Sequence, residues 1–112
     1  GLPAHPQHEL AKKQHLSPSG EYGFGGMISF ELEDIHTAKK FVKNLEIFTL
    51  AESLGGVESL VCHPATMTHA SIPSDIRNKI GITEGLLRLS VGIEDLDDLK
   101  NDIDNALVSI SS

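Results

Sequence analysis

Residues 85–110, GLLRLSVGIEDLDDLKNDIDNALVSI, contain the two clearest secondary-structure signals of the chain in direct succession. In residues 86–91 the apolar side chains alternate with Arg88 and Ser90, which is the period of a strand with one buried face. In residues 93–110 apolar side chains recur at spacings of three and four, and acidic residues crowd the first turns, as in an amphipathic helix. This stretch therefore predicts a sheet with a helix packed on one face.

The first half of the chain adds a strand, a helix and two further strands. Residues 27–32, MISFEL, alternate like a half-buried strand, and a helix with lysines on its outer face begins after the N-cap candidate Asp34. Two apolar runs, residues 47–51 and 57–62, lie on either side of the glycine pair at 55–56. Strands separated by glycines are typical of a hairpin, so we expect these two runs to be joined by a glycine turn.

Two short helices complete the predicted order. One lies within residues 5–14, and another is expected after Pro73, which the first turn of a helix tolerates, and before Gly81, a natural C-cap. From the first strand onward the order is β, α, β, β, α, β, α. We expect an α+β fold with an antiparallel sheet of about four strands and helices on one face. Residues 1–24 would form an N-terminal helix and loop, and residues 25–112 the small α+β domain.

Composition and charge exclude several classes of function. The 112 residues suffice for one hydrophobic core, and the formal net charge is −7 with only two arginines. Nucleic acids and anionic membranes need clustered Lys and Arg, so neither is an expected partner. No apolar run approaches the length of a membrane span, and the lone Cys62 leaves no internal disulfide to form. We expect a cytoplasmic protein.

Arg88 stands out because of the direction that strand alternation gives it. If helices cover Leu87 and Leu89, Arg88 lies on the opposite, helix-free face of the sheet. An arginine there presents a fork of donors suited to a carboxylate or a phosphate. A solvated surface arginine is the simpler interpretation, and the residues by themselves favour it.

Four segments resemble a known family: GLPAHPQHELAKKQ at residues 1–14, GFGGMISFEL at 23–32, FTLAESLGGVESLVCHPATMTHASIP at 48–73 and GLLRLSVGIEDLDDL at 85–99. They are similar to the C-terminal domain of the pyridoxal-phosphate-dependent trans-sulfuration enzymes, the cystathionine γ-lyase and cystathionine γ-synthase family. The succession of AESLGG, PATMTH and RLSVGIED is far more specific than any one of these motifs. The resemblance spans nearly the whole chain and implies a large cofactor domain ahead of it.

The resemblance implies a substrate-binding role for four residues. Arg88 matches the arginine that binds the substrate's α-carboxylate, and Ser53 matches a serine beside that carboxylate and the cofactor-bearing lysine. Thr68 matches a threonine of the same pocket, while Glu52 matches a glutamate near the far end of the substrate. Without the resemblance, these last three residues would be read as a turn residue, a loop hydroxyl and a solvated strand end. If the assignment holds, Arg88 and Ser53 lie within roughly 8 Å of each other on the helix-free face, with Thr68 beside them.

The implied cofactor is pyridoxal 5′-phosphate, bound mainly by the large domain. Its chemistry needs a Schiff-base lysine, an acidic partner for the pyridine nitrogen and a phosphate-binding loop, and none is recognisable in these residues. We therefore expect no catalytic residue here and no activity from this segment alone. The implied substrates are cystathionine or an activated homoserine, with γ-lyase and γ-synthase left open. The family further implies a homo-oligomer, typically a tetramer, with active sites shared between subunits.

Two other interpretations come from the residues themselves. The β, α, β, β, α, β order is also that of ferredoxin-like regulatory modules that bind amino acids between paired sheets, so a free-standing module of this kind is the alternative. A metal site would use His5 with His8, or Cys62 and His63 with His69. Zinc requires three or four ligands at a recognisable spacing, which these residues do not offer, and we expect no metal site.

Overall fold

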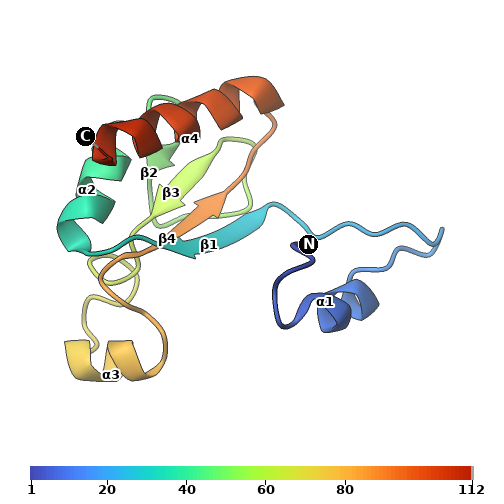
Figure 1. Cartoon of the computed structure of the whole chain (residues 1–112), viewed down its shortest axis with the longest axis horizontal. Coiled ribbons are helices and arrows are strands. Elements are labelled where there is room, and N and C mark those ends of the chain that lie inside the picture. Colours follow the sequence, from blue (N-terminus) through green and yellow to red (C-terminus); the bar gives the residue numbers. More distant parts are fainter. Residues whose placement is uncertain (112) are drawn as a thin grey trace.

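The sheet is built from the segments in which apolar residues alternate or cluster. In the computed structural model, which describes residues 1–111, four strands pair in the order β1-β4-β3-β2 (Figure 1). The strands are β1 (Met27–Glu31), β2 (Thr49–Leu50), β3 (Leu60–Cys62) and β4 (Leu86–Ser90). β4 therefore lies inside the sheet, between β1 and β3, and the predicted α+β class is confirmed.

The sheet is mixed, so the predicted purely antiparallel sheet is wrong. β4 pairs antiparallel with both β1 and β3, whereas β2 pairs parallel with β3. The expected hairpin between the two apolar runs does not form, because a hairpin joins antiparallel strands and β2 and β3 are parallel. Residues 51–59, here called the crossover loop, instead return the chain so that β3 starts beside the start of β2, with Leu60 opposite Thr49.

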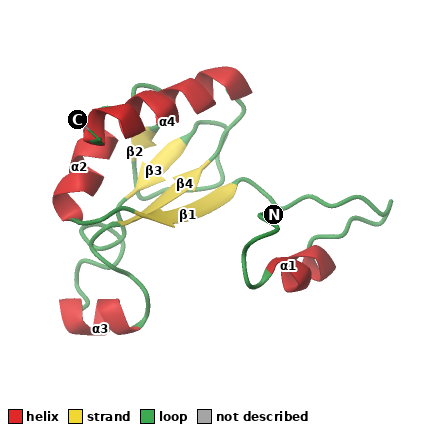
Figure 2. Ribbon diagram, viewed as in Figure 1, coloured by secondary structure: helices red, strands yellow, loops and turns green. Residues whose placement is uncertain are grey.

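Two helices cover one face of the sheet and enclose the core with it. α2 (Ile35–Lys43) and α4 (Leu96–Ile110) lie side by side on this face (Figure 2). As predicted, α2 begins after its N-cap Asp34, whose side chain accepts a hydrogen bond from the backbone N–H three residues on at 2.7 Å. The two helices bury Leu87 and Leu89 of β4, which are 0% and 2% exposed. The other core residues are Ala38, Phe41, Phe48, Val61, Leu99 and Ala106.

The remaining two helices lie outside this layer, so the predicted packing on one face holds for α2 and α4 only. α1 (His8–Gln14) belongs to an N-terminal arm that extends away from the sheet, and α3 (Ser74–Lys79) projects from the other end of the molecule (Figure 1). α3 forms where it is predicted, but Ile76 and the C-cap residue Ile80 remain 46% and 58% exposed. Within residues 1–111 no helix has the length and apolar character needed to cross a membrane.

A buried carboxylate fastens α4 to the segment between α2 and β2. Asp102 is 5% exposed. Its two oxygens accept hydrogen bonds from the backbone N–H groups of Glu46, Ile47 and Phe48, at 2.7, 2.9 and 3.1 Å. Because three consecutive N–H groups converge on one charged side chain, the chain is held firmly just before β2 and the crossover loop.

Candidate functional site

Arg88 lies in the middle of β4, on the face of the sheet that the helices leave uncovered. Its neighbours across the sheet are Ser29 of β1 and Cys62 of β3. Leu87 and Leu89 point into the core, so strand alternation directs the half-buried Arg88 side chain to the opposite face. The direction predicted from the strand pattern is therefore correct.

The Arg88 guanidinium is partly engaged and partly free. Its Nη2 donates to the backbone carbonyl of Glu52 at 3.1 Å, and within residues 1–111 no other hydrogen-bond or ion-pair partner reaches it. A guanidinium carries five N–H donors in a planar fork, so most of its donors stay available. The Glu52 carbonyl orients the group, and the remaining donors can hold a carboxylate or a phosphate by two parallel hydrogen bonds.

The crossover loop lies against this face because β4 and the residues after it hold it there. Ser90, which is 3% exposed, accepts a hydrogen bond from the Gly55 N–H at 2.8 Å. Ile93 donates its backbone N–H to the Val57 carbonyl at 2.9 Å. Gly55 has a φ of 75°, a left-handed conformation that only glycine adopts without strain. The loop therefore depends on a hydroxyl of the sheet and on a glycine of its own.

The end of the crossover loop is anchored by a carboxylate. The Glu94 oxygens accept hydrogen bonds from the backbone N–H and the hydroxyl of the buried Ser59, at 2.9 and 2.8 Å. These two bonds, with the backbone N–H the larger cause, lower the pKa of Glu94 below its ordinary value of 4.5. Ser59 Oγ also accepts from the Gly92 N–H at 2.8 Å, and a Cβ on Gly92 would overlap the backbone of Val57 and Glu58. Close backbone approach therefore requires glycine at position 92.

The structure brings only part of the predicted site together. Glu52 contacts Arg88 through its carbonyl, while its carboxylate is exposed and has no partner in residues 1–111. Ser53 is exposed as the next residue of the crossover loop. Thr68 is exposed in the loop after β3, where its hydroxyl bonds to Nδ1 of His69 at 2.7 Å. No hydrogen bond in the described residues joins Ser53 or Thr68 to Arg88, so their common pocket stays a prediction.

The polar side chains that hold the crossover loop were not predicted from the sequence. Ser90 and Glu94 each stand 35 residues from the loop residue that they bind. Alternation along β4 places Ser90 on the same face as Arg88, which is the one local signal that points to it. Nothing in the neighbourhood of Glu94 distinguishes it from the acidic residues that follow at the start of α4.

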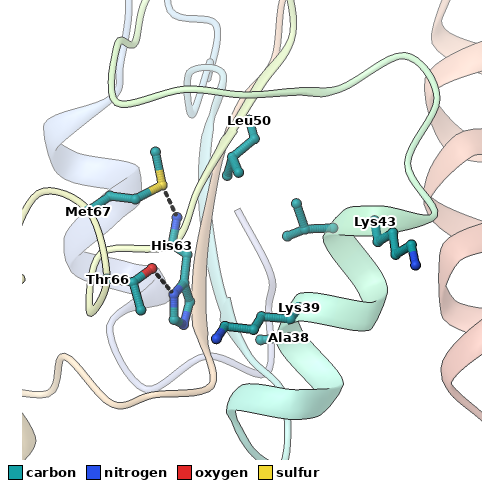
Figure 3. Close-up of a pocket in the computed structure, with 8 residues that line it drawn as sticks. Ala38, Lys39, Lys43, Leu50, His63, Thr66 and Met67 are labelled. Atoms are coloured by element: carbon teal, nitrogen blue, oxygen red, sulfur yellow. Dashed lines mark hydrogen bonds between the residues drawn. The ribbon is translucent and has the colours of Figure 1, made fainter.

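A hollow lies between α2 and the edge of the sheet, next to His63 (Figure 3). Its volume is about 300 Å³. The ring of His63 is buried and bonds through Nδ1 to the Thr66 hydroxyl at 2.6 Å and through Nε2 to the Glu84 carbonyl at 2.5 Å. Both ring nitrogens are thus engaged within the protein. In the described part of the chain no three His, Cys, Asp or Glu side chains gather where they could hold a metal ion.

Solved structures that resemble this fold include two kinds of cystathionine enzyme. The cystathionine γ-synthase of Xanthomonas oryzae pv. oryzae, in complex with cystathionine, matches at a TM-score of 0.84 and 49% identity, over 99% of this chain and 27% of that chain. The cystathionine γ-lyase of Lactobacillus plantarum, complexed with L-serine, matches at a TM-score of 0.81 and 46% identity, over 99% and 28%. The fold is thus that of a part of these cystathionine γ-synthase and cystathionine γ-lyase structures.

Sequence comparison gives the family. Residues 1–108 match the Cys/Met metabolism PLP-dependent enzyme family, and the chain belongs to that family. The cystathionine β-lyase of Lactococcus lactis subsp. lactis is 61% identical over 107 residues, which are 96% of this chain and 27% of the relative. The cystathionine γ-lyase of Bacillus subtilis is 54% identical over 110 residues, or 98% and 27%. The chain thus spans 27% of the length of both relatives. Besides the γ-lyases and γ-synthases named in the sequence analysis, the relatives also include β-lyases.

The free donors of Arg88 fit a carboxylate, but pyridoxal phosphate, which the family name implies, also needs a Schiff-base lysine. Lys39 and Lys43 belong to α2, which covers the face of the sheet opposite Arg88, and they border the hollow beside His63 (Figure 3). No lysine in residues 1–111 hydrogen-bonds to Arg88 or to the crossover loop. The described residues thus show no lysine bonded beside the arginine that could form a Schiff base with the cofactor there.

Proposed function

We propose that this chain is the C-terminal part of a longer pyridoxal-phosphate-dependent enzyme that makes or breaks carbon–sulfur bonds in trans-sulfuration. The relatives carry names from cystathionine chemistry, and the chain matches 27% of their length. In this proposal residues 25–112 form the small domain, and residues 1–24 lead into it. We assign the carbon–sulfur chemistry without choosing among β-lyase, γ-lyase and γ-synthase, because all three use an amino-acid substrate with an α-carboxylate.

The observation that carries this proposal is the half-free guanidinium of Arg88 on the helix-free face. One backbone carbonyl orients it, and its other donors face a side of the sheet that no helix of residues 1–111 covers. The α-carboxylate of an amino acid matches this planar fork. In the proposed site Ser53 donates its hydroxyl to the same carboxylate, Thr68 lines the pocket, and the exposed carboxylate of Glu52 approaches the far end of cystathionine or an activated homoserine.

The proposed division of labour follows from the residues that are present. When bound, pyridoxal phosphate supplies the electron sink for the reaction. We infer that it is held mainly by the part of the longer protein that these residues do not include. The residues here bind and orient the substrate, and by themselves they are inactive. Following the family resemblance, the complete enzyme is proposed to be a cytoplasmic homotetramer.

The test compares the longer protein with this chain. The polypeptide that carries these residues behind a large cofactor domain is purified with pyridoxal phosphate and assayed for cystathionine cleavage and for cystathionine synthesis from cysteine and an activated homoserine. The 112-residue chain is assayed in parallel, and its visible spectrum is recorded with added cofactor. We expect activity from the longer protein only. Turnover by the 112-residue chain, or a saturable absorption band tied to one of its lysines, would contradict the proposal.

The same assay separates the proposal from a free-standing regulatory module. A module that only senses amino acids would bind them reversibly and leave cystathionine intact, with or without the cofactor. No feature of residues 1–111 favours that function over the enzyme. Tight binding of a free amino acid to this chain, without any carbon–sulfur activity in the longer protein, would favour the regulatory module over the enzyme.

A further inference from the structure

The hydroxyl of Ser90 lies where it can control the shape of the proposed substrate site. We propose that Ser90 is a positioning residue: by accepting the N–H of Gly55, it holds the crossover loop over β4 so that Glu52 and Ser53 stay beside Arg88. In this role Ser90 touches no substrate and acts through the loop. The effect on the loop is independent of the proposed function, whereas the effect on substrate binding rests on it.

The placement of Ser90 supports this role. It follows Arg88 by two positions in β4, so both side chains lie on the helix-free face. Ser90 is 3% exposed, which means that the crossover loop and neighbouring strands cover it. Its Oγ lies 2.8 Å from the Gly55 nitrogen. One strand therefore carries both the guanidinium and the attachment point of the loop that flanks it.

The crossover loop has few other attachments. Residues 52–58 are all exposed and contain no helix or strand. The loop is tied near its start by the bond from Arg88 to the Glu52 carbonyl and near its end by the bond from Ile93 to the Val57 carbonyl. Between these two ties, the bond from Gly55 to Ser90 is the only hydrogen bond from the loop to the sheet in the described residues.

Loss of the hydroxyl would therefore free the middle of the loop. The Gly55 N–H can turn to water, and glycine itself opposes no backbone rotation. The Glu52 carbonyl would then orient the Arg88 guanidinium for only part of the time. Ser53 would sample a wider range of positions. Substrate binding should weaken, while the chemical step should change little because Ser90 contacts no reacting atom.

The first test measures the loop in this chain and does not depend on its function. Amide hydrogen exchange of Gly55 is followed by NMR in wild type, Ser90→Ala and Ser90→Cys, the last of which fills the space but accepts hydrogen bonds poorly. We expect exchange at Gly55 to become about tenfold faster in both variants. Ser29→Ala is the matched control, because Ser29 lies across the sheet from Arg88 and makes no hydrogen bond to the loop. Unchanged exchange in Ser90→Ala, or wild-type exchange in Ser90→Cys, would overturn the proposal.

The second test measures substrate binding in the longer enzyme. Ser90→Ala should raise KM roughly threefold to tenfold, with kcat within about twofold of wild type. Ser90→Thr, which keeps the hydroxyl, should restore most of the lost affinity. A fall in kcat of roughly threefold to tenfold with unchanged KM would overturn the positioning role. Arg88→Lys, made in parallel, identifies which claim fails: normal kinetics there would count against the proposed function, whereas normal kinetics only in Ser90→Ala would count against this inference.

Discussion

Among single residues, Asp102 is the polar residue whose loss should disturb the fold most. Its carboxylate satisfies three backbone N–H groups at once and is 5% exposed. Donors that lose their partner inside a protein cost more than the bond itself contributed, because water cannot easily replace it. The segment from Glu46 to Phe48 therefore depends on this one side chain of α4.

We predict that Asp102→Asn lowers the free energy of unfolding by about 2–4 kcal/mol. The asparagine has the same shape but a single acceptor oxygen, and its NH₂ group would face a backbone N–H. Unfolding in urea measures the difference. Asp104→Asn, at an exposed position of the same helix, is the control and should change stability by less than about 0.5 kcal/mol. Equal stability of the two variants would show that the buried carboxylate has no special role.

How much of the site can be read from the sequence depends on whether its contacts are local. Alternation within β4 suffices to place Arg88 on the helix-free face, because direction along a strand is set by adjacent residues. Ser90 and Asp102 escape prediction because their partners lie 35 and 54 to 56 residues away. Glu52 differs again: the structure uses its backbone carbonyl, which any residue at that position would offer.

Among the elements, the strands and helices themselves were predictable, but the pairing of two short strands was not. β1, β4, α2 and α4 form within their predicted segments because each has a clear apolar period. β2 and β3 have two and three residues. Two short apolar runs around a pair of glycines do not distinguish a hairpin from a crossover, since both need a flexible connection. In the folded chain the crossover loop is bonded to β4 through Gly55 and Glu52, contacts over 35 and 36 residues that neither apolar run reveals.

Glu94 joins the segment between β4 and α4 to the start of β3, and its contribution should depend on pH. Its pKa in the folded protein lies below the ordinary value of 4.5, because the N–H and the hydroxyl of Ser59 donate to the ionised carboxylate. The stabilisation is therefore fully present above pH 4.5 and is lost as the pH falls through the lowered pKa. We predict that Glu94→Gln lowers the Tm at pH 7, and that the gap to wild type narrows as the pH falls below 4.5.

Thermal unfolding at pH 7 and at pH 3 tests this expectation. Glu58→Gln is the matched control, because Glu58 is exposed, precedes Ser59 directly and has no partner within residues 1–111. Its Tm should follow wild type at both pH values. If the gap between Glu94→Gln and wild type stays the same at pH 3, the hydrogen bonds of Ser59 do not depend on the charge of Glu94.

The molecule as a whole has two unlike faces. Helices α2 and α4 occupy one side of the sheet (Figure 2) and enclose the core, while Arg88 and the crossover loop that it contacts occupy the other. The loop also presents apolar side chains to solvent, with Leu54 and Val57 at 54% and 65% exposed. In the proposed longer enzyme this face meets the part of the protein that holds the cofactor, so that substrate lies between Arg88 and the reacting centre.

The most direct test of this arrangement measures the energetic coupling between Arg88 and the substrate's carboxylate in the longer enzyme. The value of kcat/KM is determined for an S-substituted amino acid with one carboxylate and for its carboxamide, in wild type, Arg88→Lys and the charge-loss control Lys100→Leu. Arg88→Lys keeps the charge but loses the fork, so kcat/KM for the carboxylate should fall by about 1.5–3 kcal/mol in transition-state terms. For the carboxamide we predict little change, and Lys100→Leu should match wild type with both substrates. An equal loss for carboxylate and carboxamide, or no loss in Arg88→Lys, would contradict the assignment of Arg88 as the carboxylate anchor.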